Sequence, residues 1–257
     1  MFGFTYEDSE CEKYAINKYL KNKPKINGIM ILSGGETMFD IVSIFDNGNL
    51  TAVDINQEQI NIVKEKISIM NDKLLYKKYL ENLFTPFDEL FIQIKNGSQF
   101  TDIFSRENLV NKFGPNAVLN TSKDFAFHFE EIYKIKQNEQ DIFYKWIFER
   151  NMEYFVSKNK INSIESIKKV NIVCDNIINL LYSDFYDFIQ VSNLGDWMNY
   201  NEFIEFCSKI KKSLKLGGIC VIRRLLSDNL LIDQFEGCEV IIDKTYFYKE
   251  TIIWQNN

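Results

Sequence analysis

The chain has 257 residues, of which 46% are hydrophobic and 15% aromatic, and its formal net charge is −6. This is enough apolar sequence for one substantial core, or for a core with a large insertion, and the few prolines and glycines argue against a disordered protein. The acidic balance argues against a broad surface for nucleic-acid polymers or anionic membranes. No apolar run approaches the roughly 18 residues of a membrane span, and no signal segment begins the sequence, so we expect a soluble, cytoplasmic protein without a transmembrane segment.

The first part of the chain alternates between helices and strands. The expected helices are 10–21, 36–45 and 57–70, and the expected strands are 28–32 and 50–54. A Ser-Gly-Gly turn follows the first strand, and Asp54 ends the second. Glycines let the backbone approach a ligand, and an acid at that strand end can hold a ribose diol. Because the turn reads SGGET and not GxGxxG, a smaller nucleoside such as S-adenosylmethionine is favoured over a dinucleotide.

This alternation stops between residues 71 and 168. The segment is rich in aromatic residues at mostly helical spacing, and the Phe-Gly-Pro sequence at 113–115 marks one break. We expect a helical insertion or cap that forms the acceptor side, with most rings in a core and a few stacked on a ligand. The only histidine, His128, lies here within FAFHFEE, where packing among aromatics is the simplest interpretation.

The alternation resumes at residue 169. The expected strands are 170–174, 185–191 and 219–225, followed by an antiparallel closing pair at 240–243 and 246–254. The expected helices are 176–181 and 200–214, the second stopped by Gly217-Gly218. This pattern predicts an α/β fold with a doubly wound, Rossmann-like sheet of the class I methyltransferase type and a large helical insertion. Residues 1–70 and 169–257 would then form one S-adenosylmethionine-binding domain, interrupted by the cap at 71–168.

Polar residues follow four of the predicted strands. They are Ser33-Gly34-Gly35, Asp54, Asp175 and Ser192-Asn193. The carboxyl ends of parallel strands line one crevice, where an acid after the second strand would bind ribose and an acid after the third would face the adenine amine. Each acid alone could instead cap a helix, but their common position favours an adenosine site.

Cysteine and histidine usage argues against a metal site. The five cysteines are odd in number and have no CxxC spacing, which indicates reduced, mostly buried thiols. A single histidine excludes His-rich metal sites and leaves only one candidate for Ser-His-Asp hydrolysis. We therefore expect no metal.

Further motifs stand at both ends of the chain. Tyr6-Glu7-Asp8 lies near the N-terminus, SNLGDW follows the strand at 185–191, LKLGGICVIRRLL carries two arginines, and DKTYFYKE lies near the C-terminus. With SGGETMFDIV and AVDIN, these resemble the 3-amino-3-carboxypropyl transferase family, whose best-known members begin betaine-lipid synthesis. The resemblance covers both ends and the resumed α/β core, whereas only FGPNAV and FAFHF are similar in the cap. Tyr6 stands where the family carries tryptophan, which puts a stacking role for it in doubt.

The resemblance implies that S-adenosylmethionine is a substrate, that its aminocarboxypropyl arm is transferred, and that 5′-methylthioadenosine is released. The predicted cofactor contacts are Tyr6, Glu7, Asp8, Ser33, Gly34, Gly35, Glu36, Asp54, Ile55, Asp175, Asn176, Ser192, Asn193, Asp196 and Trp197. Among them Glu7, Asp8, Asn193 and Asp196 would hold the ammonium of the arm. The plainer interpretations are that Glu7 and Asp8 are surface charges and that Asp196 caps a helix beside its packed neighbour.

The remaining predicted residues concern the acceptor. Arg224, Tyr246 and Tyr248 are the predicted catalytic residues, and Arg223 and His128 are predicted to bind the acceptor. Consecutive residues of a strand point to opposite sides, so at most one arginine should face the crevice. Tyr246 and Tyr248 share one face and could equally be core.

Two acceptors fit the resemblance. The favoured one is a soluble peptidyl-nucleotide phosphate, as in the enzymes of microcin C maturation, in which a partner protein then decarboxylates the transferred group. The other is diacylglycerol, as in betaine-lipid synthesis, although the chain is acidic and shows no basic amphipathic helix. From other classes, an ordinary S-adenosylmethionine-dependent methyltransferase and a non-catalytic nucleoside-binding protein stay open.

Overall fold

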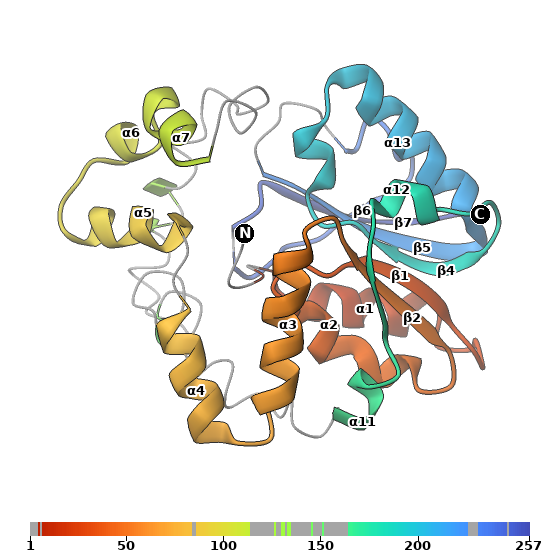
Figure 1. The fold of residues 1–257 in the computed structure, drawn as a ribbon. Coiled ribbons are helices and arrows are strands. Elements are labelled where there is room, and N and C mark those ends of the chain that lie inside the picture. Colours follow the sequence, from red (N-terminus) through yellow and green to blue (C-terminus); the bar gives the residue numbers. More distant parts are fainter. Residues whose placement is uncertain are drawn as a thin grey trace.

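The computed structural model describes residues 5, 7–83, 86–113, 164–225, 231–245 and 247–257, with isolated positions between 126 and 151. Its centre is a seven-stranded sheet in the order β3-β2-β1-β4-β5-β7-β6 (Figure 1). The strands are β1 (Asn27–Ile31), β2 (Asn49–Asp54), β3 (Asn171–Cys174), β4 (Tyr186–Gln190), β5 (Leu214–Arg224), β6 (Glu239–Val240) and β7 (Glu250–Gln255). The first five are parallel, and β7 is antiparallel to both of its neighbours. This confirms the predicted doubly wound, Rossmann-like sheet of the class I methyltransferase type.

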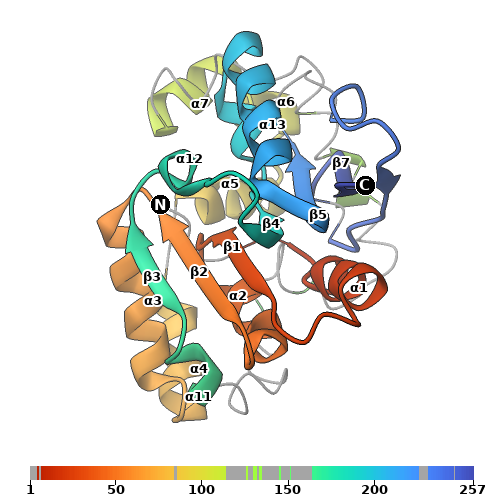
Figure 2. The same cartoon turned by 90° about the vertical axis from the view of Figure 1, so that its right-hand side faces the viewer.

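Helices cover both faces of the sheet (Figures 1 and 2). One face carries α1 (Glu10–Tyr19), α2 (Glu36–Ile41), the 3-10 turn η1 (Val42–Phe45) and α3 (Gln57–Ile69), and the other carries α12 (Ile177–Leu180) and α13 (Tyr200–Ser213). Because strand side chains alternate, Met30 and Ala52 join the first apolar core, while Ile29 and Val53 join the second.

The longest covering helix, α13, shows how the sequence specifies such an element. At its start the side chain of Asn199 accepts from the Glu202 amide at 3.1 Å, and the Glu202 carboxylate accepts from the Asn199 amide at 2.9 Å. This capping box satisfies two backbone donors that the helix leaves unpaired. Phe203, Cys207 and Ile210 then recur at helical spacing and are buried in the second core.

The predicted boundaries fail at the glycine pair. The sequence pattern predicts that Gly217-Gly218 stops a helix, but α13 ends at Ser213 and β5 begins at Leu214, so both glycines lie within a strand. Gly217 has a φ of 70°, and the pairing of β5 with β4 shifts register at this level. Glycines are therefore needed here to permit an irregular strand and not to end a helix. The closing pair of strands is antiparallel as predicted, but shorter.

The described part of the segment 71–168 is mostly helical. It contains α4 (Lys73–Asn82), α5 (Pro86–Lys95), α6 (Phe100–Ile103), α7 (Arg106–Phe113) and α11 (Ile164–Ile167). Buried side chains such as Leu80, Leu90 and Phe104 belong to the same apolar cluster as those of α2 and β1. These helices therefore share a core with the sheet, and the predicted division into a domain and a cap stays a prediction. No described helix is long and apolar enough to cross a membrane.

The turn before β2 generates a prediction for stability. A Cβ atom on Gly48 would lie 2.0 Å from the carbonyl oxygen of Ile26, which accepts the Asn49 amide at 3.0 Å and so begins the pairing of β1 with β2. We expect Gly48→Ala to lower the free energy of unfolding by about 1–3 kcal/mol, because the chains must move apart. In Gly97→Ala, with a φ of 95° and open space around the new methyl, only the backbone cost of about 1 kcal/mol applies. Urea denaturation measures the free energy of unfolding of both variants. An equal loss in Gly48→Ala and Gly97→Ala would contradict the steric explanation.

Candidate functional site

The carboxyl ends of β1, β2 and β4 enclose a cavity of about 240 Å³. Six of its lining residues are among those predicted from sequence, namely Ser33, Asp54, Ile55, Ser192, Asn193 and Trp197. The last two belong to the turn after β4, which contains the 3-10 helix η4 (Leu194–Trp197). Strand order reverses between β1 and β4, and this is where doubly wound sheets bind ligands.

Asp54 lies at the end of β2, on the wall of this cavity. Its Oδ1 accepts the amide of Asn56 at 2.9 Å, which fixes the carboxylate. Burial raises the pKa of Asp54 above its usual value, while the backbone N–H groups of Asn56 and Ser33 oppose the rise. The large apolar side chains of Ile55 and Trp197 line the same cavity and are 74% and 44% exposed. A carboxylate beside two exposed apolar surfaces suits the ribose and the ring of a nucleoside.

The turn after β1 is held from inside the protein. Lys66 donates to the carbonyl of Gly34 at 2.8 Å and pairs with Glu36 at 2.5 Å, and both charged side chains are buried. Glu36, a predicted cofactor contact, thus points inward and stabilises the turn. Sequence reasoning missed Lys66, although it lies at helical spacing after Val63 on the apolar side of α3, and a lysine at such a position is the signal that could have found it.

The glycine turn has little freedom to change shape. Ser33 has a φ of 47° and Gly35 a φ of 92°, and a Cβ on Gly35 would lie 3.0 Å from the ring of Phe39. The Gly34 amide donates to the hydroxyl of Thr5 at 2.9 Å. That amide is therefore occupied by the protein itself in this structure, and Gly34 and Gly35 shape the turn without lining the cavity.

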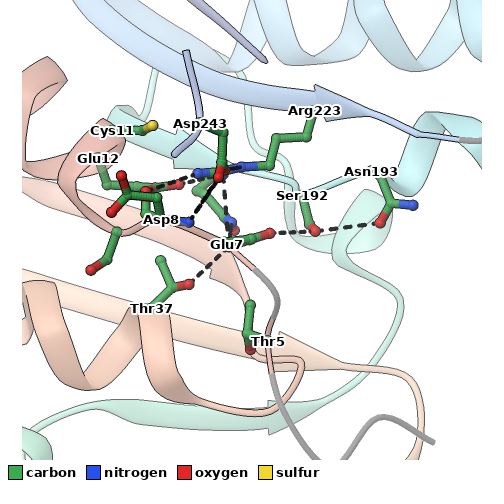
Figure 3. A network of polar contacts seen from close by, with 12 residues as sticks. Thr5, Glu7, Asp8, Cys11, Glu12, Thr37, Ser192, Asn193, Arg223 and Asp243 are labelled. Atoms are coloured by element: carbon green, nitrogen blue, oxygen red, sulfur yellow. Dashed lines mark hydrogen bonds and ion pairs between the residues drawn. The ribbon is translucent and has the colours of Figure 1, made fainter. Parts of the chain in front are cut away.

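Glu7 lies at the centre of a buried polar network (Figure 3). Its carboxylate accepts from Thr37 Oγ1 at 2.8 Å, from Gln190 Nε2 at 2.8 Å and from Ser192 Oγ at 2.5 Å, and its side chain is 1% exposed. Ser192 lines the cavity and has a left-handed φ of 51°. Glu7 therefore lies behind the cavity wall and fixes the position of Ser192. Sequence reasoning missed its partners Thr37 and Gln190, for which no sequence signal was present.

Arg223 is enclosed by carboxylates (Figure 3). Its guanidinium contacts Glu12 at 2.5 and 3.1 Å, Asp243 at 3.0 Å and Glu7 at 3.7 Å, and it donates to the Asp8 carbonyl at 3.4 Å. The side chain has no exposed surface. Contact with an acceptor, the role predicted for Arg223, would require the guanidinium to leave these partners. Glu12 was not selected from sequence because an acidic residue in the first turn of a helix is ordinary.

Two of the three predicted catalytic residues, Arg224 and Tyr248, lie among the described residues and have different surroundings. Arg224 pairs with Glu250 at 2.9 Å and its side chain is 13% exposed. The ring of Tyr248 lies 5.5 Å from the Arg223 guanidinium carbon. Burial, and then the nearby Glu7 carboxylate, raise the pKa of Tyr248 well above its usual value, so its phenol stays protonated and can donate a hydrogen bond but not act as a base.

Several predicted contacts also serve as local caps. Asp8 accepts the Glu10 amide at 3.2 Å, Asn176 accepts the Ile178 amide at 3.0 Å at the start of α12, and Asp175 accepts from Asn179 at 2.9 Å. Asp175 does not line the cavity, although its backbone amide donates to the Asp54 carbonyl at 3.1 Å.

Asp196 is buried beneath the turn after β4. It accepts from the Asn193 side chain at 2.9 Å and from the Leu225 amide at 2.8 Å. Asp196 thus holds Asn193 against the cavity and ties this turn to the end of β5.

The predicted residues Tyr6, His128 and Tyr246 lie outside the described residues. The five cysteines all carry free thiols, and Cys11, Cys207 and Cys220 are buried. Among the described side chains, no group of three or more His, Cys, Asp or Glu could hold a metal ion.

Comparisons with known proteins find similarity in structure only. No protein-family model matches the sequence, and no curated protein matches it. The N-methyltransferase NodS from Bradyrhizobium japonicum, solved with S-adenosyl-L-homocysteine, is 8% identical, with a TM-score of 0.44 over 96% of this chain and 86% of that one. The [4+2]-cyclase SpnF is 10% identical, with a TM-score of 0.42, and the match spans 91% of this chain but only 59% of SpnF. The precorrin-6y C5,15-methyltransferase from Geobacter metallireducens is 9% identical, with a TM-score of 0.41 over 95% and 86% of the two chains. No conclusion about activity follows at these values.

Glu12 generates a prediction for pH dependence. Burial raises its pKa from 4.5 to about 7, although Arg223 acts in the opposite direction. Since the pKa is higher in the folded state, folding takes up a proton, and this contribution to stability is complete below about pH 4.5 and is lost as the pH rises through 7. We expect the free energy of unfolding to fall less steeply between pH 5 and pH 8 in Glu12→Gln than in the wild type, measured by urea denaturation. The exposed Glu10→Gln on the same helix is the control and should keep the wild-type slope. Identical slopes in all three proteins would refute the assignment.

Arg223 generates a prediction for stability. Arg223→Met leaves the buried Glu12 and Asp243 carboxylates without their cation, so we expect a loss of about 3–5 kcal/mol. Arg223→Lys keeps the charge and should lose less. The control Arg224→Met removes a cation that keeps some contact with solvent and pairs with one carboxylate, so it should cost less, about 1–2 kcal/mol. Equal losses of unfolding free energy for the two methionine variants in urea denaturation would contradict the prediction that the enclosed Arg223 contributes more to stability than Arg224.

Proposed function

We propose that the chain is an S-adenosylmethionine-dependent transferase that moves the 3-amino-3-carboxypropyl group to an acceptor and releases 5′-methylthioadenosine. The observation that carries this proposal is one cavity lined by Ser33 after β1, by Asp54 after β2, and by Ser192, Asn193 and Trp197 after β4. The carboxylate of Asp54, hydroxyl groups and apolar side chains meet there at the reversal point of a parallel sheet. These are the groups that an adenosine moiety requires.

In the proposed complex the ribose hydroxyls bind Asp54, which has one oxygen already fixed by the Asn56 amide. The purine lies against the exposed surfaces of Ile55 and Trp197. Asp175 does not line the cavity, but its backbone amide donates to the Asp54 carbonyl, and we propose that its carboxylate meets the adenine amine. Each of these roles follows from position at a strand end and from the chemistry of the side chain.

The choice of the aminocarboxypropyl arm rests on the resemblance of both chain ends to the aminocarboxypropyl transferases. One contact supports this choice, because it joins two of the motifs that carry the resemblance. Glu7 of the N-terminal motif accepts a hydrogen bond from Ser192, the first residue of SNLGDW. Ser192 and Asn193 line the cavity and can accept hydrogen bonds from the ammonium of the arm. Glu7 and Asp196 act from behind, by holding these two side chains in place.

The proposed reaction is a displacement at the carbon of the arm next to sulfur. An acceptor oxygen forms a bond to this carbon, the carbon–sulfur bond breaks, and its electron pair neutralises the sulfonium as methylthioadenosine leaves. The carbon that is aligned with the acceptor is the one transferred, so positioning decides between arm and methyl transfer. A phosphate oxygen is already anionic and needs no base, which agrees with a protonated Tyr248.

The favoured acceptor is a soluble peptidyl-nucleotide phosphate, with a decarboxylase acting on the product. The acidic chain, with a net charge of −6, argues against the diacylglycerol acceptor because that lipid requires docking on a membrane surface. Arg224, at 13% exposure, is the described cation at the end of β5 that could approach an anionic acceptor from the surface.

The test is product identity. The purified chain is incubated with S-adenosylmethionine and with a peptidyl-nucleotide or a diacylglycerol vesicle, and the nucleoside product is identified by mass spectrometry. We expect methylthioadenosine with the peptidyl-nucleotide, and at least about tenfold weaker cofactor binding in Asp54→Ala by calorimetry, because a charged hydrogen bond is lost. S-adenosylhomocysteine as product would establish methyl transfer instead, and methylthioadenosine only with vesicles would establish the lipid acceptor. Cofactor binding without either product would indicate a non-catalytic binding protein. Unchanged affinity in Asp54→Ala would refute the site.

A further inference from the structure

A second cavity, of about 380 Å³, lies at the opposite end of the sheet. Its lining includes Asn27, Asn49 and Asn171, which are the first residues of β1, β2 and β3, and the rings of Tyr182 and Phe185 from the connection before β4. The nucleoside cavity lies at the far ends of the same strands. The two are therefore separated by the length of a strand, roughly 15 Å at about 3.3 Å per residue.

This part of the sheet is open because the helix after β3 is short. The helix α12 has four residues, and Ile177 belongs to the same apolar cluster as Ile29 and Val53, toward the carboxyl ends of the strands. Figure 2 shows the amino-terminal halves of β2 and β3 with none of the described helices in front of them. On this face, the carboxyl-terminal halves of β1 and β2 carry Ile29 and Val53, which pack in the same cluster as α12. The amino-terminal halves, which α12 does not cover, carry Asn27, Asn49 and Thr51 instead.

A pair of amides lies on this open face. Asn27 and Asn49 are directly opposite in the β1–β2 pairing, and Asn49 Nδ2 donates to Asn27 Oδ1 at 3.0 Å. This bond leaves the Asn27 NH₂ group and the Asn49 carbonyl oxygen, for which the described residues provide no further hydrogen bond. Asn171 is opposite Thr51 in the β2–β3 pairing, and these two residues add a third amide and a hydroxyl. Asparagine is disfavoured in strands, so these positions are not explained by backbone preference.

Two aromatic rings border the amides. Tyr182 and Phe185 are 54% and 47% exposed, and their rings meet edge to face with centroids 6.0 Å apart. Phe185 meets Tyr186 in the same way at 5.0 Å. This packing orients the rings while large apolar surfaces stay in contact with water, and a flat ligand would remove those surfaces from water.

The charge of the cavity differs from that of the chain. Lys169 is the charged residue among those that line it, and no carboxylate lines it, although the net charge of the chain is −6. The Lys169 ammonium lies 3.9 Å from Asp46, and its side chain is 65% exposed. A neutral or anionic ligand is therefore accepted more readily than a cation.

We propose that this cavity is a second ligand site, which binds a planar heterocycle of the nucleobase type. The ring stacks on Tyr182 or Phe185, its donor–acceptor edge meets the Asn27–Asn49 pair, and an attached phosphate reaches Lys169. Adjacent donors and acceptors are what the edge of a nucleobase offers, and aromatic stacking is the usual means of holding its faces. The proposal rests on this cavity alone and is independent of the proposed transferase activity.

The experiment titrates uridine 5′-monophosphate, uridine and ribose 5-phosphate into the full chain, with calorimetry or saturation-transfer NMR as readout. Pyrimidine probes are used because the first cavity is proposed to hold adenosine. We expect saturable binding of both uridine compounds, weakened about tenfold or more by Tyr182→Ala and several-fold by Asn49→Ala. Lys169→Ala should weaken the monophosphate but not uridine. Trp197→Ala, which removes a similarly exposed aromatic ring at the other cavity, is the matched control and should leave binding unchanged.

These substituted side chains are exposed, so the variants should fold, and circular dichroism checks that they do. The proposal is overturned if neither uridine compound binds saturably at millimolar concentration. It is also overturned if ribose 5-phosphate binds as well as the monophosphate, since the ring then contributes nothing. Loss of binding in Trp197→Ala with none in Tyr182→Ala would place the probes in the first cavity and would refute the second site.

Discussion

One guanidinium group surrounded by three carboxylates joins the two ends of this chain to its sheet. Arg223 comes from β5, Glu7 and Glu12 from the first residues, and Asp243 from the last turn before β7. Removing these charges from water is unfavourable unless each finds a partner. Here Glu7 and Glu12 lie on the N-terminal segment, which forms no strand, whereas Asp243 lies between the paired strands β6 and β7. The position of the N-terminal segment, and through Glu7 the position of Ser192 on the cavity wall, therefore depends on this cluster.

The part of the site that local sequence encodes could be predicted. Ser33-Gly34-Gly35 and Asp54 were found because a glycine turn and an acid at a strand end are visible in a few consecutive residues, and parallel strands bring their carboxyl ends together. Lys66 and Glu12 could not be assigned in this way, because their roles arise only when distant segments meet. Gly217-Gly218 shows a further limit, since a glycine pair marks backbone freedom but does not tell whether a helix ends or a strand bends.

The carboxyl ends and the amino ends of the parallel strands present different side chains to their cavities. At the carboxyl ends, the cavity has the carboxylate of Asp54 and a wall fixed by buried hydrogen bonds. At the amino ends, amides and exposed rings occupy the area that a longer helix after β3 would have covered. Shortening one connecting helix thus exposes a second surface of the sheet without disturbing its order, because strand pairing is maintained by the backbone.

The contact between Asp8 and Asp243 spans 235 positions of sequence. During synthesis Glu7 and Glu12 precede every described strand, and their carboxylates meet Arg223 of β5 only after β1 to β4 have been made. The third carboxylate, that of Asp243, is made later still, after β6. Contacts that close such long loops form late in folding. The wall behind Ser192 is consequently among the last parts to be completed, so a prematurely terminated chain would contain most of the sheet and yet lack a finished pocket.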